Sequence, residues 1–230
     1  MPLPLLTRRW CCRYGGAYAC LPELDALFAG VSHRGVDSFC VNCHKKLLCP
    51  FDLSVLYLSD RYPVIRALSV SPEYLRNAAS DSGAVVDFEH WQLPLGRRFR
   101  ALKLWFVLRR FGAAGVRAHL RAGIRLRGVV EACIRDDPLF ELEPSAPPSL
   151  SLVCFRLAGC DDDLQRRFLA AVKATGKCFI IHTRLGDRLV LRFACGGLEQ
   201  SEADVRAGWS VIADTARSFL AAQASKQHDG

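Results

Sequence analysis

The densest group of nucleophilic and metal-ligating side chains in this sequence lies between residues 40 and 49. The run Cys40–Lys46 reads CVNCHKK, and Cys49 follows it. The spelling C-x-x-C-H is that of a c-type haem attachment site, but Met1 is the only methionine, so a methionine axial ligand is excluded. Zinc could use the two cysteines, the histidine and Cys49. Structural zinc sites usually pair two clusters across a longer loop, however, so we expect no metal here and treat the cysteines as small apolar residues.

Lys45 offers a different chemistry. A lysine beside His44 and Asn42, between two β-type runs, could form a Schiff base with a carbonyl cofactor. An amine with that role needs a fixed position in a crowded, partly apolar site. Because most lysines are solvated, the residues alone leave both interpretations of Lys45 open.

Short elements are predicted around this run. Composition and spacing favour strands over 38–41, 47–48 and 54–58, and short helical segments over 22–28 and 62–68. The segment 69–87 is rich in Pro, Asn, Ser, Asp and Gly, which predicts a long polar loop. Loops of this length often serve as lids.

The later part of the chain has clearer periodicity. Apolar residues at helical spacing predict two helices, 96–111 and 115–135, with Gly112 as a C-terminal cap. Beyond residue 138 the order is strand, strand, helix, strand, strand, helix, over 140–142, 150–157, a helix opened by 161–163, 178–182, 188–194 and 201–222. This order is typical of a small α+β domain. The nearest thing to a linker is Pro144–Ser149, which reads PSAPPS.

Composition narrows the class of protein. The chain has 230 residues, half of them apolar, which is enough for one large domain or two small ones. No apolar run approaches the ~20 residues that cross a bilayer. The apolar Leu3–Leu6 precedes Arg8 and Arg9, which is the reverse of a signal peptide. We therefore expect a cytoplasmic protein with no membrane partner, whose eleven cysteines are reduced.

A basic stretch raises the question of nucleic acid. Arg97–Arg127 holds ten lysines and arginines and no acid, within a chain of formal charge +8. This could be a nucleic-acid face. We favour a pair of amphipathic helices whose arginines are solvated or paired with acids, because the signal for nucleic acid is one of composition only. We expect no nucleic-acid partner.

Several motifs occur in an order that resembles the pyridoxal-phosphate-dependent group II amino-acid decarboxylases, closest to the aromatic-L-amino-acid branch. The similarity covers roughly residues 22 to 222. It is carried by Asn42–Lys45, Phe51–Asp52, Ser71–Leu75, Asp81–Gly83, Asp87–Gln92, Pro94–Trp105, Leu152–Leu157 and Val190–Phe193.

The resemblance implies roles for individual residues. Lys45 matches the lysine that binds the cofactor, pyridoxal 5'-phosphate, as an imine. His44 would lie against the cofactor or substrate, and Asn42 would help to hold the phosphate. Tyr74 matches the tyrosine of a mobile loop that protonates the substrate carbon after CO₂ leaves, which favours amine over aldehyde products. Gly96 matches a position where a small residue leaves room for a bulky aromatic ring, so the implied substrate is an aromatic L-amino acid.

Three departures from the family pattern stand out. The aspartate that pairs with the cofactor's ring nitrogen falls on Gly15, or on Tyr14 in the other register, and neither is acidic. Lys46 replaces the usual tryptophan after the cofactor lysine. The chain also starts past the family's midpoint. We therefore expect this chain to be weak or inactive alone.

The predicted fold class is α/β, as the C-terminal part of a fold-type I pyridoxal-phosphate-dependent enzyme. Residues 1–118 are expected to form part of the large cofactor-binding domain, with 1–20 atypical, and 119–230 the small α+β domain. The expected partners are an amino-acid substrate and either a second copy in a homodimer or a full-length homologue. Two alternatives to an enzyme remain: a non-catalytic remnant that pairs with such a homologue, and a basic nucleic-acid-binding protein.

Overall fold

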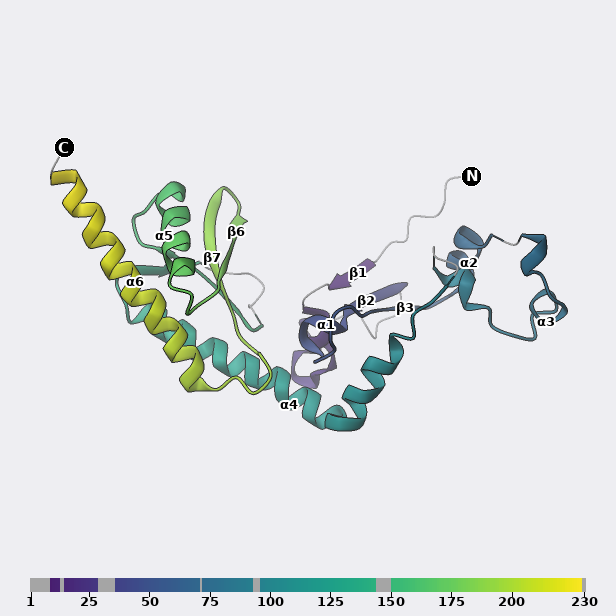
Figure 1. Cartoon of the computed structure of the whole chain (residues 1–230). Coiled ribbons are helices and arrows are strands. Elements are labelled where there is room, and N and C mark those ends of the chain that lie inside the picture. The colour runs from purple at the N-terminus through teal and green to yellow at the C-terminus, as the bar shows by residue number, and fades with distance from the viewer. Residues whose placement is uncertain are drawn as a thin grey trace. The chain divides into compact units, whose positions relative to one another are not determined.

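The computed structural model describes residues 9–12, 15–28, 36–70, 72–92, 96–143 and 150–228 (Figure 1). The chain divides into two compact units, Met1–Ala113 and Ala114–Gly230. Both mix helices with a β-sheet, so the predicted α/β class is confirmed. The predicted linker Pro144–Ser149 lies outside the described residues, as does Tyr14. Within the described residues no helix is both long and apolar enough to cross a membrane.

The first unit is built on a three-stranded sheet in the order β1-β2-β3. Strand β1 (Arg9–Cys12) runs parallel to β2 (Ser38–Asn42), and β3 (Ser54–Leu58) is antiparallel to β2. The strands predicted over 38–41 and 54–58 are confirmed. The β-type run at 47–48 is wrong, because the chain leaves the short helix α1 (Cys43–Lys46) there and Leu48 takes a left-handed φ of 59°.

Short helical elements complete this unit. They are η1 (Gly15–Cys20), η2 (Pro22–Leu24), α2 (Tyr62–Leu68), η3 (Glu73–Leu75), α3 (Ala78–Asp81) and η4 (Phe88–Trp91). The segment predicted as a plain loop over 69–87 therefore contains η3 and α3. Its polar residues act partly as caps, since the Asn77 side chain accepts hydrogen bonds from the main-chain N–H groups of Ala79 and Ser80.

The two helices predicted over 96–111 and 115–135 form one element, α4 (Ala101–Arg135), that is interrupted at Gly112. Gly112 has φ 64° and ψ 176°, a conformation that glycine adopts without steric cost. The glycine thus ends the first helical segment as predicted, and the division between the two units follows directly after it.

The second unit has a four-stranded antiparallel sheet in the order β4-β5-β7-β6. The strands are β4 (Phe140–Leu142), β5 (Leu152–Leu157), β6 (Ile181–Leu185) and β7 (Arg188–Ala194), and the helices are α5 (Asp162–Ala174) and α6 (Glu202–His228). The predicted order of elements is confirmed. Strand β6 starts at Ile181, three residues later than predicted, and α6 extends to His228.

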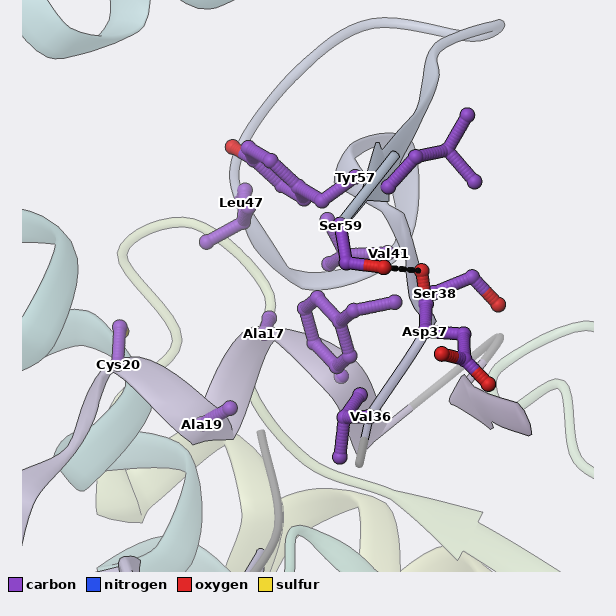
Figure 2. A pocket seen from close by; sticks show the side chains of 13 residues that line it. Ala17, Ala19, Cys20, Val36, Asp37, Ser38, Val41, Leu47, Tyr57 and Ser59 are labelled. Carbon is purple, nitrogen blue, oxygen red and sulfur yellow. Dashed lines mark hydrogen bonds between the residues drawn. The ribbon is translucent and has the colours of Figure 1, made fainter. Parts of the chain in front are cut away.

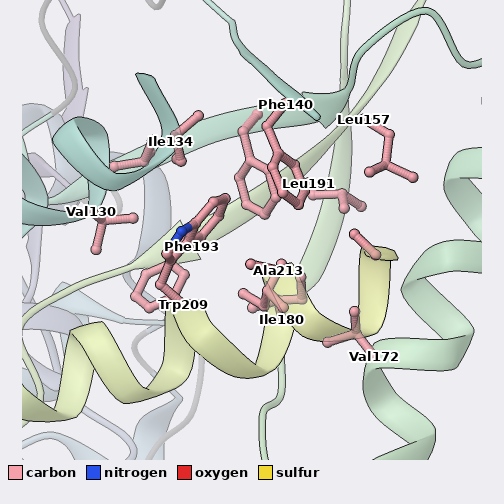
Figure 3. Close-up of a cluster of buried hydrophobic side chains, with 14 of the residues drawn as sticks. Val130, Ile134, Phe140, Leu157, Val172, Ile180, Leu191, Phe193, Trp209 and Ala213 are labelled. Carbon is pink, nitrogen blue, oxygen red and sulfur yellow. The ribbon is translucent and has the colours of Figure 1, made fainter. Parts of the chain in front are cut away.

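An apolar core fills the space between this sheet and the three helices of the second unit (Figure 3). Aromatic rings form its centre: Phe140 meets Trp209 with ring centroids 4.7 Å apart, and Phe155 meets Trp209 at 5.5 Å. Val130 and Ile134 from α4 and Val172 from α5 are fully buried against them. Burial on this scale stabilises the unit through the hydrophobic effect.

One charged side chain is buried beside this core. Arg156 on β5 is only 4% exposed. It lies 3.1 Å from Asp162 Oδ1, donates to the Cys160 carbonyl and is within 3.9 Å of Glu143. The Leu189 N–H and the Arg156 guanidinium hold the pKa of the Asp162 carboxyl below its ordinary value. The network joins β5 to the start of α5.

Replacing one member of this network should destabilise the second unit. Arg156→Met keeps the length of the side chain but removes the buried cation that Asp162 and Glu143 face, so we expect the free energy of unfolding to fall by about 3 kcal/mol. Arg184 contacts the same Asp162 from solvent, and Arg184→Ala should have a much smaller effect. Chemical denaturation of both variants measures this, and equal losses would contradict the account.

Candidate functional site

Asn42 occupies the junction between β2 and α1. It is the residue before the first turn of α1, yet its side chain does not cap the helix. Instead the Leu53 carbonyl accepts from the main-chain N–H groups of Cys43 (3.0 Å) and His44 (3.3 Å). Asn42 Oδ1 is buried and has no hydrogen-bond partner within the described part of the chain. Because buried polar atoms are nearly always paired, this oxygen marks a place where a ligand could bind.

The two adjacent lysines of α1 have opposite environments. Lys45 is exposed, whereas Lys46 is only 5% exposed. Consecutive residues of a helix do not face the same way, so the helix buries one lysine and presents the other. The Lys45 amine is therefore the one that a ligand at this site can reach.

His44 is held by the same loop that caps α1. The Leu53 N–H donates to His44 Nδ1 at 2.9 Å. The ring of Phe51 meets the imidazole edge-on, with centroids 4.7 Å apart and an interplanar angle of 67°. No hydrogen bond to Nε2 is present among the described residues. That nitrogen is available to a ligand.

The Phe51–Leu53 loop is in turn tethered to the start of α4. Lys103 Nζ donates to the carbonyls of Phe51 (3.1 Å) and Asp52 (3.3 Å), and Arg100 Nε donates to Asp52 Oδ1 at 3.2 Å. The hydrogen bond from Arg100 lowers the pKa of Asp52 below its ordinary value. Sequence reasoning missed this tether, because the spacing of about 50 residues between its two ends has no local pattern.

The cysteines around α1 form no metal site within the described residues. The ligand atoms of Cys40, Cys43, His44 and Cys49 do not lie together. Among all the described residues, the one group whose ligand atoms do is Asp87, Glu89 and His90. Burial and the neighbouring Cys49 and Cys40 raise the pKa of Cys43 to about 11.

Two predicted site residues lie apart from α1. Tyr74 on η3 is 81% exposed and makes no hydrogen bond or ring contact among the described residues. Gly96 is exposed, and a Cβ added there would meet nothing within 4 Å. The structure therefore brings together Asn42, His44 and Lys45 but does not bring Tyr74 or Gly96 to them. Their roles stay predictions.

A pocket of about 590 Å³ lies against the sheet of the first unit (Figure 2). Its wall includes Ala17 and Ala19 of η1, Val41 of β2, Leu47 after α1 and Tyr57 of β3. None of the predicted site residues lines it. Gly16, which follows the Gly15 of the atypical first segment, does. The pocket is thus mainly apolar, and its chemistry differs from that of the polar groups on α1.

The basic stretch Arg97–Arg127 is partly neutralised by acids. Arg100 pairs with Asp52, and Arg127 pairs with Glu131 at 2.8 Å. These contacts support the interpretation of the basic stretch as part of structural helices and not as a nucleic-acid face.

Comparisons with known proteins show what this chain is similar to. Residues 12–158 match the family model described as the pyridoxal-dependent decarboxylase conserved domain. The aromatic-L-amino-acid decarboxylase of Rattus norvegicus is 40% identical over 91% of this chain and 42% of its own length. A phenylacetaldehyde synthase of Arabidopsis thaliana is 39% identical over 90% of this chain and 43% of its own length.

A solved structure shows the same similarity in three dimensions. The Oryza sativa TDC crystallised with PLP and tryptamine aligns with a TM-score of 0.84 and 36% identity, over 92% of this chain and 44% of that one. The chain therefore spans less than half the length of the relatives that it matches.

The Asp52 tether should make stability depend on pH. A carboxyl whose pKa is lower in the folded than in the unfolded state stabilises the fold above its ordinary pKa, and this contribution is lost as pH falls through the folded value. Asp52→Asn should therefore lower the melting temperature at pH 7, and the difference from the unsubstituted chain should shrink in acid. Asp25→Asn, at an exposed site without an ion pair among the described residues, is the control. A difference that stays constant from pH 7 to acid would contradict the tether.

Proposed function

The chain belongs to the family of pyridoxal-dependent decarboxylases, and from this premise we propose that it forms the lysine-bearing part of a site that decarboxylates aromatic L-amino acids to amines. The arrangement of Asn42, His44 and Lys45 at the end of β2 carries the proposal. Within four residues the chain offers a buried oxygen without a partner, an open ring nitrogen and an exposed amine. Pyridoxal phosphate needs an amine for its aldehyde and hydrogen-bond donors for its phosphate, and Lys45 Nζ and the Asn42 Nδ2–H groups would supply these.

Each residue would have a distinct task. Lys45 would hold the cofactor covalently through Nζ, and the Asn42 amide would bind its phosphate. When bound, the cofactor supplies a conjugated ring that takes up the electron pair left when the carboxylate departs. His44 would fix the orientation of the bound molecule, which decides which bond to Cα breaks.

The segment that carries Tyr74 would act as a lid. Tyr74 Oη would donate a proton to Cα once CO₂ has left, and closure would exclude water from the reaction. Gly96 would lie beside the substrate ring, where the absence of a side chain would leave room for a bulky group. A tryptamine-bound relative and an aromatic-L-amino-acid decarboxylase support an aromatic substrate.

The lack of an acidic residue at Gly15, or at Tyr14 in the other register, would limit the rate of decarboxylation by this chain alone. A carboxylate near the ring nitrogen would stabilise the electron sink, and glycine has no side chain to supply one. We therefore expect weak turnover or none without another chain. The nine cysteines whose side chains the structure describes form no disulfide with one another, which supports a reducing compartment such as the cytoplasm.

A second candidate function is pairing with another polypeptide. The first segment of α4 and the residues before it expose large apolar side chains, among them Phe99 (75%), Trp105 (53%) and Phe106 (58%). A groove of about 500 Å³ runs between Phe99 and Leu108. Exposed apolar patches of this kind often mark protein interfaces. A homodimer or a complex with a full-length homologue would cover them.

Borohydride trapping tests the cofactor site. Incubation with pyridoxal phosphate followed by borohydride should leave a stable adduct on Lys45, found by mass spectrometry of the digested chain. Lys45→Arg should remove this adduct, and Lys177, which is exposed in the bend after α5, provides a control for nonspecific labelling. Absence of an adduct on Lys45, under conditions that label an intact relative, would overturn the proposal.

Association tests the second candidate. Analytical ultracentrifugation of the chain, alone and with an intact relative, should show a heavier species. Trp105→Glu should weaken it, because a charge would be buried in an apolar contact. Phe179→Glu places the same charge on an exposed aromatic (79%) of the second unit and should change nothing. A chain that stays monomeric in both mixtures contradicts pairing.

A further inference from the structure

We propose that the main chain of Leu53 holds His44 as the neutral Nε2–H tautomer, so that this side chain meets a ligand as a hydrogen-bond donor and not as a base. The assignment of the tautomer rests on contacts within the chain. The meaning for a bound ligand rests on the proposed function. The inference makes Leu53 a positioning residue that acts through His44.

The tautomer of His44 follows from the hydrogen bonds that its ring makes with the main chain of Leu53. The Leu53 N–H donates to His44 Nδ1 at 2.9 Å, which requires Nδ1 to carry a lone pair and no proton. In a neutral imidazole the proton is then on Nε2. Leu53 is only 5% exposed, and its N–H has no other acceptor within the described residues. Moving the proton to Nδ1 would leave that buried donor unpaired.

The competing tautomer has a poor alternative partner. With a proton on Nδ1, the ring could donate to the Leu53 carbonyl, which lies 3.1 Å away. That oxygen already accepts from the main-chain N–H groups of Cys43 and His44. A carbonyl oxygen has two lone pairs, and both are in use. The Nδ1–H form therefore loses one hydrogen bond and gains none of equal quality.

The resulting Nε2–H group is placed for an external acceptor. Nε2 has no hydrogen-bond partner among the described residues, and the edge-on contact with Phe51 restricts rotation of the ring. Lys45 follows this residue directly in the sequence, and Asn42 lies two positions before it. An anionic oxygen is the matching chemistry, whether it belongs to a substrate carboxylate or a cofactor phosphate. The tethers from Arg100 and Lys103 keep the Phe51–Leu53 loop in place.

Nitrogen NMR of the full chain with ¹⁵N-labelled histidine tests the tautomer directly. His44→Gln identifies the His44 resonances by their disappearance. We expect an unprotonated nitrogen at Nδ1 and a proton on Nε2. His182, exposed on β6 without a hydrogen-bond partner in the described chain, should show the averaged pattern of two exchanging tautomers. A proton on His44 Nδ1, or an averaged pattern like that of His182, would overturn the inference.

Two further variants separate the contribution of Leu53 from that of ring packing. Phe51 is 82% exposed, so Phe51→Ala should fold and keep the same tautomer. Loss of the tautomer in that variant would assign it to the ring contact and overturn the role of Leu53. His44→Ala should speed hydrogen exchange of the Leu53 amide by about tenfold or more, whereas His44→Asn keeps an acceptor and should largely preserve protection. Unchanged exchange in His44→Ala would also overturn the proposal.

A ligand arm distinguishes the two sources of the anionic oxygen. Inorganic phosphate and an aromatic L-amino acid are added separately to the labelled chain, and a shift of the Nε2–H resonance identifies which one binds His44. A shift with either supports the donor role, and a shift with neither overturns it. The tautomer measurement needs neither cofactor nor turnover. Failure of Lys45 labelling would therefore contradict the proposed function while leaving the tautomer assignment intact.

Discussion

The candidate site depends on the contact between the main chain of Leu53 and the first turn of α1. A helix of four residues cannot satisfy its own leading N–H groups and is not stable by itself. The Leu53 carbonyl accepts hydrogen bonds from two of those N–H groups, and the main-chain N–H of Leu53 orients His44. Because the loop caps the helix, the Asn42 side chain is not needed for capping. The same contact therefore fixes α1 and leaves Asn42, His44 and Lys45 available to a ligand.

The rest of the first unit can be understood as support for this contact. Strand β3 follows Leu53 directly and pairs with β2 in a register that sets Asn42 opposite Ser54. The Phe51–Leu53 loop is also bound by Arg100 and Lys103, which belong to the basic stretch that first suggested nucleic acid. Burial of Lys46 anchors the helix while Lys45 faces solvent. The positive charges of Arg100 and Lys103 thus hold the loop beside a site that suits anionic ligands.

The sequence predicted more of the second unit than of the first, and the difference has physical reasons. In the second unit the β-type run over 150–157 and the acidic cap at Asp161 are local signals, and they predicted β5 and α5 well. In the first unit the family motif singled out Asn42, His44 and Lys45. No local pattern could indicate that Leu53 caps α1 or that Arg100 holds Asp52, since these contacts join distant residues. The left-handed turn at Leu48 was missed because leucine rarely adopts it.

The central claim is that α1, held by Leu53, presents one cofactor-binding surface. Titration of the ¹⁵N-labelled chain with pyridoxal phosphate, followed by NMR, tests it most directly. The account predicts that the Asn42 side-chain amide, the His44 Nε2–H and the Lys45 main-chain amide shift together and saturate at one equivalent, while the Leu53–His44 hydrogen bond persists. Shifts confined to other lysines, or no saturable change at Asn42 and His44, would contradict it.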